Sequence, residues 1–143
     1  MPLLIFLTAL SFSLGFGARY AAEHYLTKTI VLLDPYVSLQ LASNPGVAFS
    51  MQLGPLQPLV VGAALLLFMW MAYRMKHVTL AQFAFGFILG GAIANIVDRL
   101  KDGLVTDYFR VMSFPIFNVP DAFITVGVIL LILEETILKK REY

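Results

Sequence analysis

Four long apolar stretches limit how this chain can fold. A transmembrane helix needs roughly 20 residues to cross a hydrocarbon core of about 30 Å. The stretches cover residues 2–22, 55–73, 79–97 and 119–138, and each is long enough or nearly so. Hydrophobic residues make up 59% of the 143 residues, so the chain has too few polar side chains to cover a soluble core. We therefore predict an all-α integral membrane protein in which residues 1–143 form one domain with four transmembrane helices.

The first stretch has a second interpretation as a cleaved signal peptide. Its apolar run ends in the small residues of Gly15-Phe16-Gly17-Ala18, as such peptides do before their cleavage site. A signal peptide also begins with a positively charged segment, and neither Lys nor Arg precedes this run. The sequence therefore favours a retained helix.

The placement of Lys and Arg predicts the orientation of the helices, because short cytoplasmic segments carry an excess of positive charge. Arg74 and Lys76 crowd the short connection between the second and third stretches, and three more cations lie within 139–143. The remaining cations are Arg19, near the end of the first stretch, and four spread over two long loops that also contain acids, about residues 23–54 and 98–118. We predict that both termini are cytoplasmic and that the long loops lie on the outer face.

The composition excludes several kinds of site. The chain has no cysteine, which excludes disulfides, thiol nucleophiles and cysteine-based metal sites. His24 and His77 lie far apart and lack metal-ligand spacing, so we predict neither a metal nor a cofactor. A net charge of +1 provides no basic surface field, so we predict no nucleic-acid partner.

The long outer loops carry patterns typical of strands. Apolar residues alternate over residues 36–53, interrupted by Asn44-Pro45-Gly46, which predicts a β-hairpin. A second short strand is predicted at Leu104–Val111, followed by aromatic residues suited to the membrane interface. This small β-element is expected either to bind an extended peptide by strand addition or only to cover the helix ends.

Two aspartates lie where apolar stretches meet these loops. A carboxylate at the bilayer centre costs about 2.5–3.5 kcal/mol, so such acids call for an explanation. Twelve uncharged residues separate Asp121 from Glu134 and span only about 18 Å as a helix, which places Asp121 below the headgroups. For Asp98, spacing along a helix places Asn95 within hydrogen-bonding reach. An interfacial ion pair between Asp98 and Arg99 is the alternative.

The third stretch also carries small residues at every fourth position, Gly86, Gly90 and Ala94. Such a stripe lets the backbone of another helix approach closely. Before the fourth stretch, Asn118 and Pro120 are typical of a helix start, which places Asp121 in the first turn of its helix.

Four ordered motifs give this chain a resemblance to the lipoprotein signal peptidases, bacterial signal peptidase II. The family's Asn-x-Gly-x-Ala-Phe motif is similar to the segment that begins at Asn44, and its Gly-Gly-x-x-x-Asn-x-x-Asp-Arg motif to residues 90–99. The other two motifs are similar to Val105-Thr106-Asp107-Tyr108 and Phe117-Asn118-Val119-Pro120-Asp121. Two positions depart from the family without removing a catalytic group, Ser43 and Pro120.

The resemblance implies roles for individual residues. It implies a catalytic pair formed by Asp98 and Asp121. Residues expected to contact the substrate backbone are Asn44, Gly46 and Arg99, and residues expected to support the site are Asn95, Asn118, Asp107 and Lys28. For Asp107 we predict a structural role, such as anchoring its loop to Arg99. The family has an acid four residues before this lysine, whereas the chain has His24 there and Glu23 beside it.

The resemblance also implies a function. The chain is expected to be an aspartic endopeptidase of the bacterial cytoplasmic (inner) membrane that removes signal peptides from diacylglyceryl-modified prolipoproteins. Cleavage before the lipidated cysteine would use a water activated by two aspartates, without metal, in a monomer surrounded by membrane lipids. The main alternative is a non-catalytic four-helix transporter subunit or scaffold whose acids bind a proton or cation. Another intramembrane hydrolase is disfavoured, because the chain lacks serine or cysteine nucleophile motifs and a His-Glu-x-x-His helix.

Overall fold

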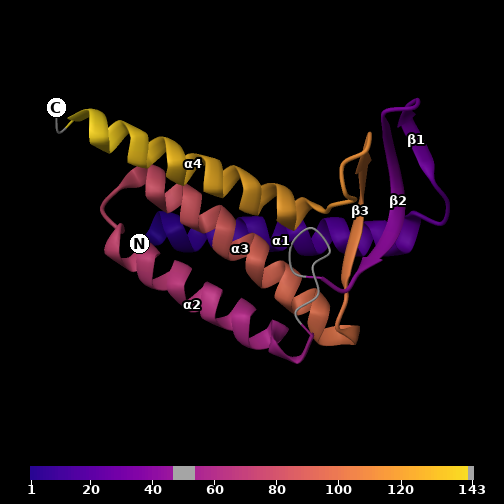
Figure 1. The fold of residues 1–143 in the computed structure, drawn as a ribbon, viewed down its shortest axis with the longest axis horizontal. Coiled ribbons are helices and arrows are strands. Elements are labelled where there is room, and N and C mark those ends of the chain that lie inside the picture. The colour runs from indigo at the N-terminus through magenta and orange to yellow at the C-terminus, as the bar shows by residue number, and fades with distance from the viewer. Residues whose placement is uncertain (47–53, 142–143) are drawn as a thin grey trace.

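The computed structural model describes residues 1–46 and 54–141, with side chains as far as residue 136. In chain order the elements are α1 (Pro2–Tyr25), β1 (Ile30–Leu33), β2 (Val37–Asn44), a short 3-10 turn (Gly54–Leu56), α2 (Gln57–Arg74), α3 (Thr79–Asp102), β3 (Val105–Val111) and α4 (Val119–Arg141). The helices lie along one another with the sheet at one end, and both termini lie at the opposite end (Figure 1).

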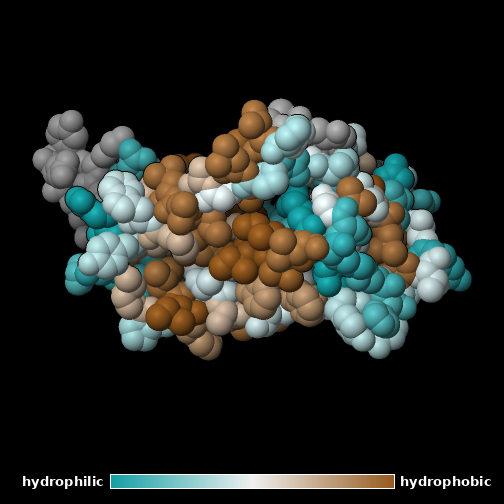
Figure 2. Space-filling model, turned by 90° about the horizontal axis from the view of Figure 1, so that it is seen from below, coloured by the Kyte–Doolittle hydropathy of each residue, from teal (hydrophilic) through white to brown (hydrophobic). Residues whose placement is uncertain are grey.

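Among the described residues, three segments are long and apolar enough to cross a membrane, and they are Pro2–Tyr25, Gly54–Arg74 and Thr79–Asp102. The surface of α2 is apolar and largely exposed: Ala72 is its one buried residue, while Leu65, Phe68 and Met71 are partly buried against the core. Figure 2 shows an apolar band between more hydrophilic ends of the molecule. Such a surface suits a lipid environment, which confirms the prediction of a mostly helical membrane protein with a small β-element.

Three helices extend by three residues or more beyond the C-terminal residue that the apolar pattern predicts. Helix α1 continues past residue 22 to Tyr25, α3 past residue 97 to Asp102, and α4 past residue 138 to Arg141. Gly103 ends α3 in the left-handed conformation, with φ of 83° and its N–H donated to the carbonyl oxygen of Arg99. Asp98 therefore belongs to a helix and not to the following loop.

Helix α3 packs between α1 and α4 because small residues line two of its faces. A Cβ atom added at Gly90 would lie 2.5 Å from the carbonyl oxygen of Thr8 in α1. A Cβ atom at Gly91 would lie 2.6 Å from the carbonyl oxygen of Pro120 in α4. The predicted close helix approach is confirmed, and it brings the first turn of α4 against α3 just before Asp121.

Replacing Gly90 with alanine is expected to destabilise the helix packing by about 1–3 kcal/mol, because the backbone of α1 must move to admit the methyl group. The measurement is the thermal unfolding temperature in detergent. Gly62→Ala is the matched control, since nothing lies within 4 Å of a Cβ atom there. Equal unfolding temperatures for the two variants would contradict this packing.

The sheet is antiparallel with the strand order β1-β2-β3. The strand predicted at 104–111 is confirmed as β3, and the first half of the predicted hairpin is confirmed as β2. The predicted second half of that hairpin falls on residues 47–53, which lie outside the described residues. Within the described chain, β2 pairs instead with β1 before it and with β3. Every residue of β1 is exposed and apolar, so β1 lacks the alternation by which a strand is recognised.

Candidate active site

Asn118 is the centre of a polar cluster where α3, α4 and β3 meet. It precedes the first residue of α4, and its side-chain oxygen accepts the N–H of Asp121 at 2.8 Å. The carboxylate of Asp121 in turn accepts the N–H of Asn118 at 3.3 Å. This reciprocal capping fixes the carboxylate at the helix start, as the sequence predicts.

Asp121 receives a further hydrogen bond from α3. The amide nitrogen of Asn95 donates to its carboxylate at 2.8 Å. The amide of Asn118 also reaches Asn95, with 3.2 Å between its nitrogen and the Asn95 side-chain oxygen. The prediction that Asn95 binds Asp98 is therefore wrong, because Asn95 faces α4.

Asp107 is buried on β3, with 2% of its surface exposed. Its two carboxylate oxygens accept one amide each, from Asn118 at 2.8 Å and from Asn44 at 2.9 Å. Burial raises the pKa of Asp107 to about 6, and the charge of Asp121 adds to this rise while the hydrogen bond from Asn44 opposes it. The predicted anchor to Arg99 is replaced by these two amides, and Asn118 links Asp107 directly to Asp121.

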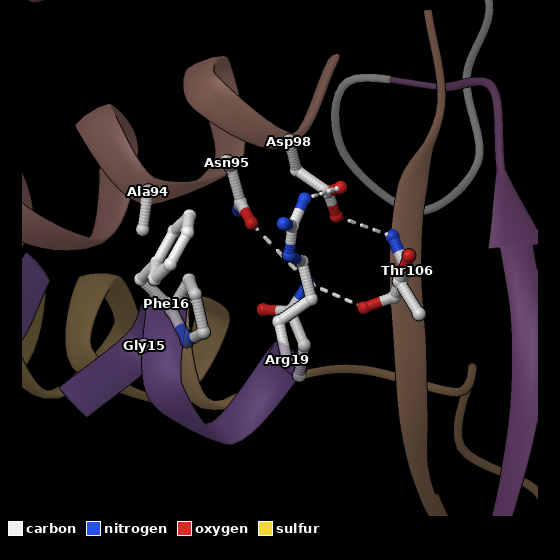
Figure 3. Close-up of a pocket in the computed structure, with 9 residues that line it drawn as sticks. Gly15, Phe16, Arg19, Ala94, Asn95, Asp98 and Thr106 are labelled. Carbon is white, nitrogen blue, oxygen red and sulfur yellow. Dashed lines mark hydrogen bonds and ion pairs between the residues drawn. The ribbon is translucent and has the colours of Figure 1, made fainter. Parts of the chain in front are cut away.

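Asp98 lies apart from this pair. It forms an ion pair with Arg19 of α1 and accepts the backbone N–H of Thr106 at 2.7 Å. Figure 3 shows Arg19 reaching from α1 to Asp98, with Thr106 beside it. Within the described residues Asp98 and Asp121 share no hydrogen-bond partner, and the basic partner of Asp98 is Arg19, where the sequence suggested Arg99.

The structure brings together the three residues predicted to contact substrate. Arg99 donates to the carbonyl oxygen of Gly46, and the N–H of Gly46 donates to the side-chain oxygen of Asn44 at 2.8 Å. The Nε of Arg99 is buried and has no partner among the described residues. Arg99 therefore retains a donor for another group.

A cavity of about 530 Å³ lies beside these groups. Its polar wall contains Asn44, Asn95, Arg99 and Asp121, and its apolar wall includes Phe117. A pocket with a largely apolar lining and a few convergent polar groups suits a ligand with an apolar part and a polar bond to be positioned. Asp98 and Arg19 line a separate rear cavity of about 10 Å³ (Figure 3), and Asn95 lines both cavities.

The C-terminal end of α1 contributes Glu23 to the site region. Glu23 accepts a hydrogen bond from the hydroxyl of Thr106 at 3.1 Å and lies 3.5 Å from the ammonium of Lys101. His24 is exposed and stacks on Tyr20, with 4.1 Å between the ring centroids. Of these two residues, Glu23 and not His24 therefore makes polar contacts near the site.

The structure departs from the predicted site at two residues, Lys28 and Arg19. Lys28 is exposed and makes no hydrogen bond or ion pair with the described chain, so the structure does not bring it to the cluster. Arg19 was missed, although a cation inside an apolar helix, four residues before Glu23, was a usable signal. Within the described residues, no group of three or more His, Asp or Glu side chains is placed to hold a metal ion.

Comparison with known proteins places this chain in a family. A family model described as signal peptidase (SPase) II matches residues 7–137. Lipoprotein signal peptidases of Brucella ovis and Brucella melitensis are each 34% identical over 149 aligned positions, covering 96% of this chain and 92% of theirs. Two bacterial membrane enzymes solved by the in meso method, at 2.3 and 1.9 Å resolution, share its fold with TM-scores of 0.86 and 0.83. They are 21% and 20% identical, covering 99% and 94% of this chain and 90% and 92% of theirs. The chain belongs to the signal peptidase II family of peptidases.

Proposed function

We propose that this protein removes signal peptides from diacylglyceryl-modified prolipoproteins, cleaving before the lipidated cysteine. In this proposal Asp107 and Asp121 activate the attacking water. The observation that supports it is the bridge of Asn118 between these two carboxylates: its side-chain amide donates to Asp107 and its backbone N–H donates to Asp121, which lines the cavity with polar and apolar walls. The names of the relatives, lipoprotein signal peptidases, support the substrate class.

The proposed pair differs from the predicted pair of Asp98 and Asp121. Asp107 shares Asn118 with Asp121, and the pKa of about 6 for Asp107 lies near physiological pH, as suits a general acid or base. Asp98 is bound by Arg19 and Thr106 and lines the small rear cavity, apart from the cavity that Asp121 lines. These contacts favour Asp107 as the partner of Asp121, and the catalytic role of Asp98 stays an untested prediction.

The proposed chemistry follows the pattern of paired carboxylates. One ionised carboxylate takes a proton from water while the oxygen of that water attacks the peptide carbonyl carbon. The protonated partner donates a hydrogen bond to the carbonyl oxygen, where negative charge develops. Collapse of the tetrahedral intermediate breaks the C–N bond, and a proton passes to the departing amine. No covalent intermediate with the enzyme is needed.

In this proposal the backbone of the substrate peptide binds to Asn44 and Arg99, beside the two carboxylates. Arg99 retains a buried donor, and Asn44 lines the cavity while its amide holds Asp107. A substrate backbone that binds Asn44 and Arg99 therefore sits one hydrogen bond away from the catalytic pair. Gly46 lies next to these residues, where its carbonyl oxygen accepts a hydrogen bond from Arg99.

We further propose that α4 is the fourth transmembrane helix. The N- and C-termini of the chain would then lie on the same side of the membrane. This agrees with Figure 1, where both termini lie at the end of the helices opposite the sheet. The distribution of Lys and Arg assigns the chain ends to the cytoplasm and the site to the outer face of the bacterial inner membrane. A monomer surrounded by lipid would meet its lipid-anchored substrate by diffusion within the bilayer.

The proposed function is tested with purified protein in lipid nanodiscs. A prolipoprotein carrying the diacylglyceryl group is expected to be cut just before its modified cysteine, as read by product mass. The same prolipoprotein without lipid is the control, and slower cleavage of it by at least about tenfold is expected, because the lipid positions the scissile bond. No cleavage of the lipidated substrate would contradict the proposal. No observation favours the transporter or scaffold alternative.

The pKa of Asp107 predicts how stability depends on pH. Its pKa is about 6 in the folded protein against 3.8 as the ordinary value, so the folded state binds more protons between these pH values. Stability from this group is therefore fully present below about pH 4 and is lost as the pH rises to about 6. The unfolding temperature of Asp107→Asn should fall less than that of wild type between pH 4 and 7. The exposed Asp34→Asn is the control, and identical pH slopes for wild type and Asp107→Asn would contradict the prediction.

A further inference from the structure

An ion pair between Arg19 and Asp98 connects three elements behind the site. The side chains of Arg19 and Asp98 are 15% and 6% exposed, so the pair is largely shielded from water. One oxygen of Asp98 meets the Arg19 guanidinium, and the other accepts the backbone N–H of Thr106 at 2.7 Å. The pair thus joins α1, α3 and the beginning of β3, as Figure 3 shows.

Thr106 is held from a second direction as well. Its hydroxyl donates to Glu23 of α1 at 3.1 Å, and Glu23 lies one helical turn after Arg19. Asp98 therefore fixes the backbone of Thr106, and Glu23 fixes its side chain. The next residue in the strand is Asp107, so these contacts with α1 help to position its carboxylate.

The pair stands behind the substrate cavity and not within it. Neither Arg19 nor Asp98 lines the 530 Å³ cavity, whereas both line the rear cavity of about 10 Å³. Arg19 is also supported by Phe16, with 5.0 Å from its guanidinium carbon to the ring centroid. Arg19 is thus held by contacts between the helices, outside the cavity in which a peptide would bind.

We propose that Arg19 is a positioning residue of the peptidase site, acting through Asp98 and Thr106 to hold Asp107 beside Asp121. This inference rests on the proposed function. A buried ion pair fixes geometry in this way because loss of one partner leaves the other charge buried and uncompensated. The neutral double variant should therefore be less impaired than the sum of its two single changes implies.

The test compares Arg19→Gln, Asp98→Asn and the double variant in the nanodisc cleavage assay. Each single change is expected to lower kcat by about 10–100-fold, since a small displacement of a catalytic group has effects of this size. KM should change by less than about threefold, because the pair does not line the substrate cavity. The double variant should regain at least about tenfold over the weaker single variant. Arg19→Lys should retain more activity than Arg19→Gln, because it keeps the charge.

The matched control is Arg110→Gln, which removes an exposed arginine from the far end of β3 and should leave kcat unchanged. Full kcat in Arg19→Gln would overturn the inference. Equal and complete loss in Asp98→Asn and in the double variant would also overturn it, because Asp98 would then act on the substrate itself. Both outcomes differ from failure of the proposed function, in which wild type cleaves nothing.

A second measurement does not depend on cleavage. The infrared carboxyl band that disappears in Asp107→Asn reports the protonation of Asp107, whose pKa is about 6. Arg19→Gln is expected to lower the pH midpoint of this band, because a displaced β3 exposes Asp107 to water. Arg110→Gln should leave the midpoint in place. An unchanged midpoint in Arg19→Gln would overturn the inference.

Discussion

Replacing Asp121 with asparagine is expected to lower kcat for prolipoprotein cleavage by at least about 10³-fold. The amide cannot accept the proton that the attacking water must lose, and it cannot stand in as the acid. The capping contact can be kept, since an asparagine oxygen can still accept the N–H of Asn118. The loss should therefore appear in kcat with little change in folding.

The measurement is single-turnover cleavage in nanodiscs, with product mass as the readout. Asp34→Asn is the matched control, because it makes the same chemical change at an exposed turn between β1 and β2. The control should cleave at the wild-type rate. Activity of Asp121→Asn within about tenfold of wild type would show that this carboxylate does not take part in the reaction.

Replacing Asn118 with aspartate is expected to lower kcat by at least about 10²-fold and to lower the unfolding temperature. The change is nearly isosteric, yet it exchanges a donor for a carboxylate oxygen 2.8 Å from Asp107. Asn118 is 2% exposed, so the new charge would lie buried beside an existing acid. Asn118→Asp also loses the donor to Asn95.

The control for this second prediction is Ser113→Asp, which adds a negative charge to the exposed loop before Asn118. It should leave kcat and the unfolding temperature nearly unchanged. A raised pH midpoint for the carboxyl band of Asp107 is expected in Asn118→Asp, because like charges favour the protonated form. An active and equally stable Asn118→Asp would contradict the bridging role of Asn118.

The helices were predictable because each leaves its own local signal. Apolar runs of membrane-spanning length located the helices, and the small residues around Gly90 predicted the close approach of another helix, which the structure shows to be α1. Asn118 and Pro120 marked the start of α4, because capping depends on neighbouring residues. The exposed β1 has no alternation, so its pairing with β2 left no pattern to detect.

The partners of the acids were harder to predict. Helical spacing placed Asn95 within reach of Asp98, but spacing along one helix does not say which neighbouring helix each side chain faces. The side chain of Asp98 binds Arg19, which is 79 positions away in sequence, and the side chain of Asn95 binds Asp121. The bridge from Asn118 to Asp107 joins a helix cap to a strand, and only the packed structure reveals it.

The proposed catalytic pair of Asp107 and Asp121 is tested by comparing three variants in one assay. Asp98→Asn, Asp107→Asn and Asp121→Asn are compared at equal protein amounts, with cleavage of the diacylglyceryl-modified prolipoprotein followed by mass spectrometry. Asp107→Asn and Asp121→Asn are expected to lose at least about 10³-fold in kcat, whereas Asp98→Asn should retain activity within about 100-fold of wild type. Loss of all activity in Asp98→Asn, with Asp107→Asn still active, would contradict the assigned pair.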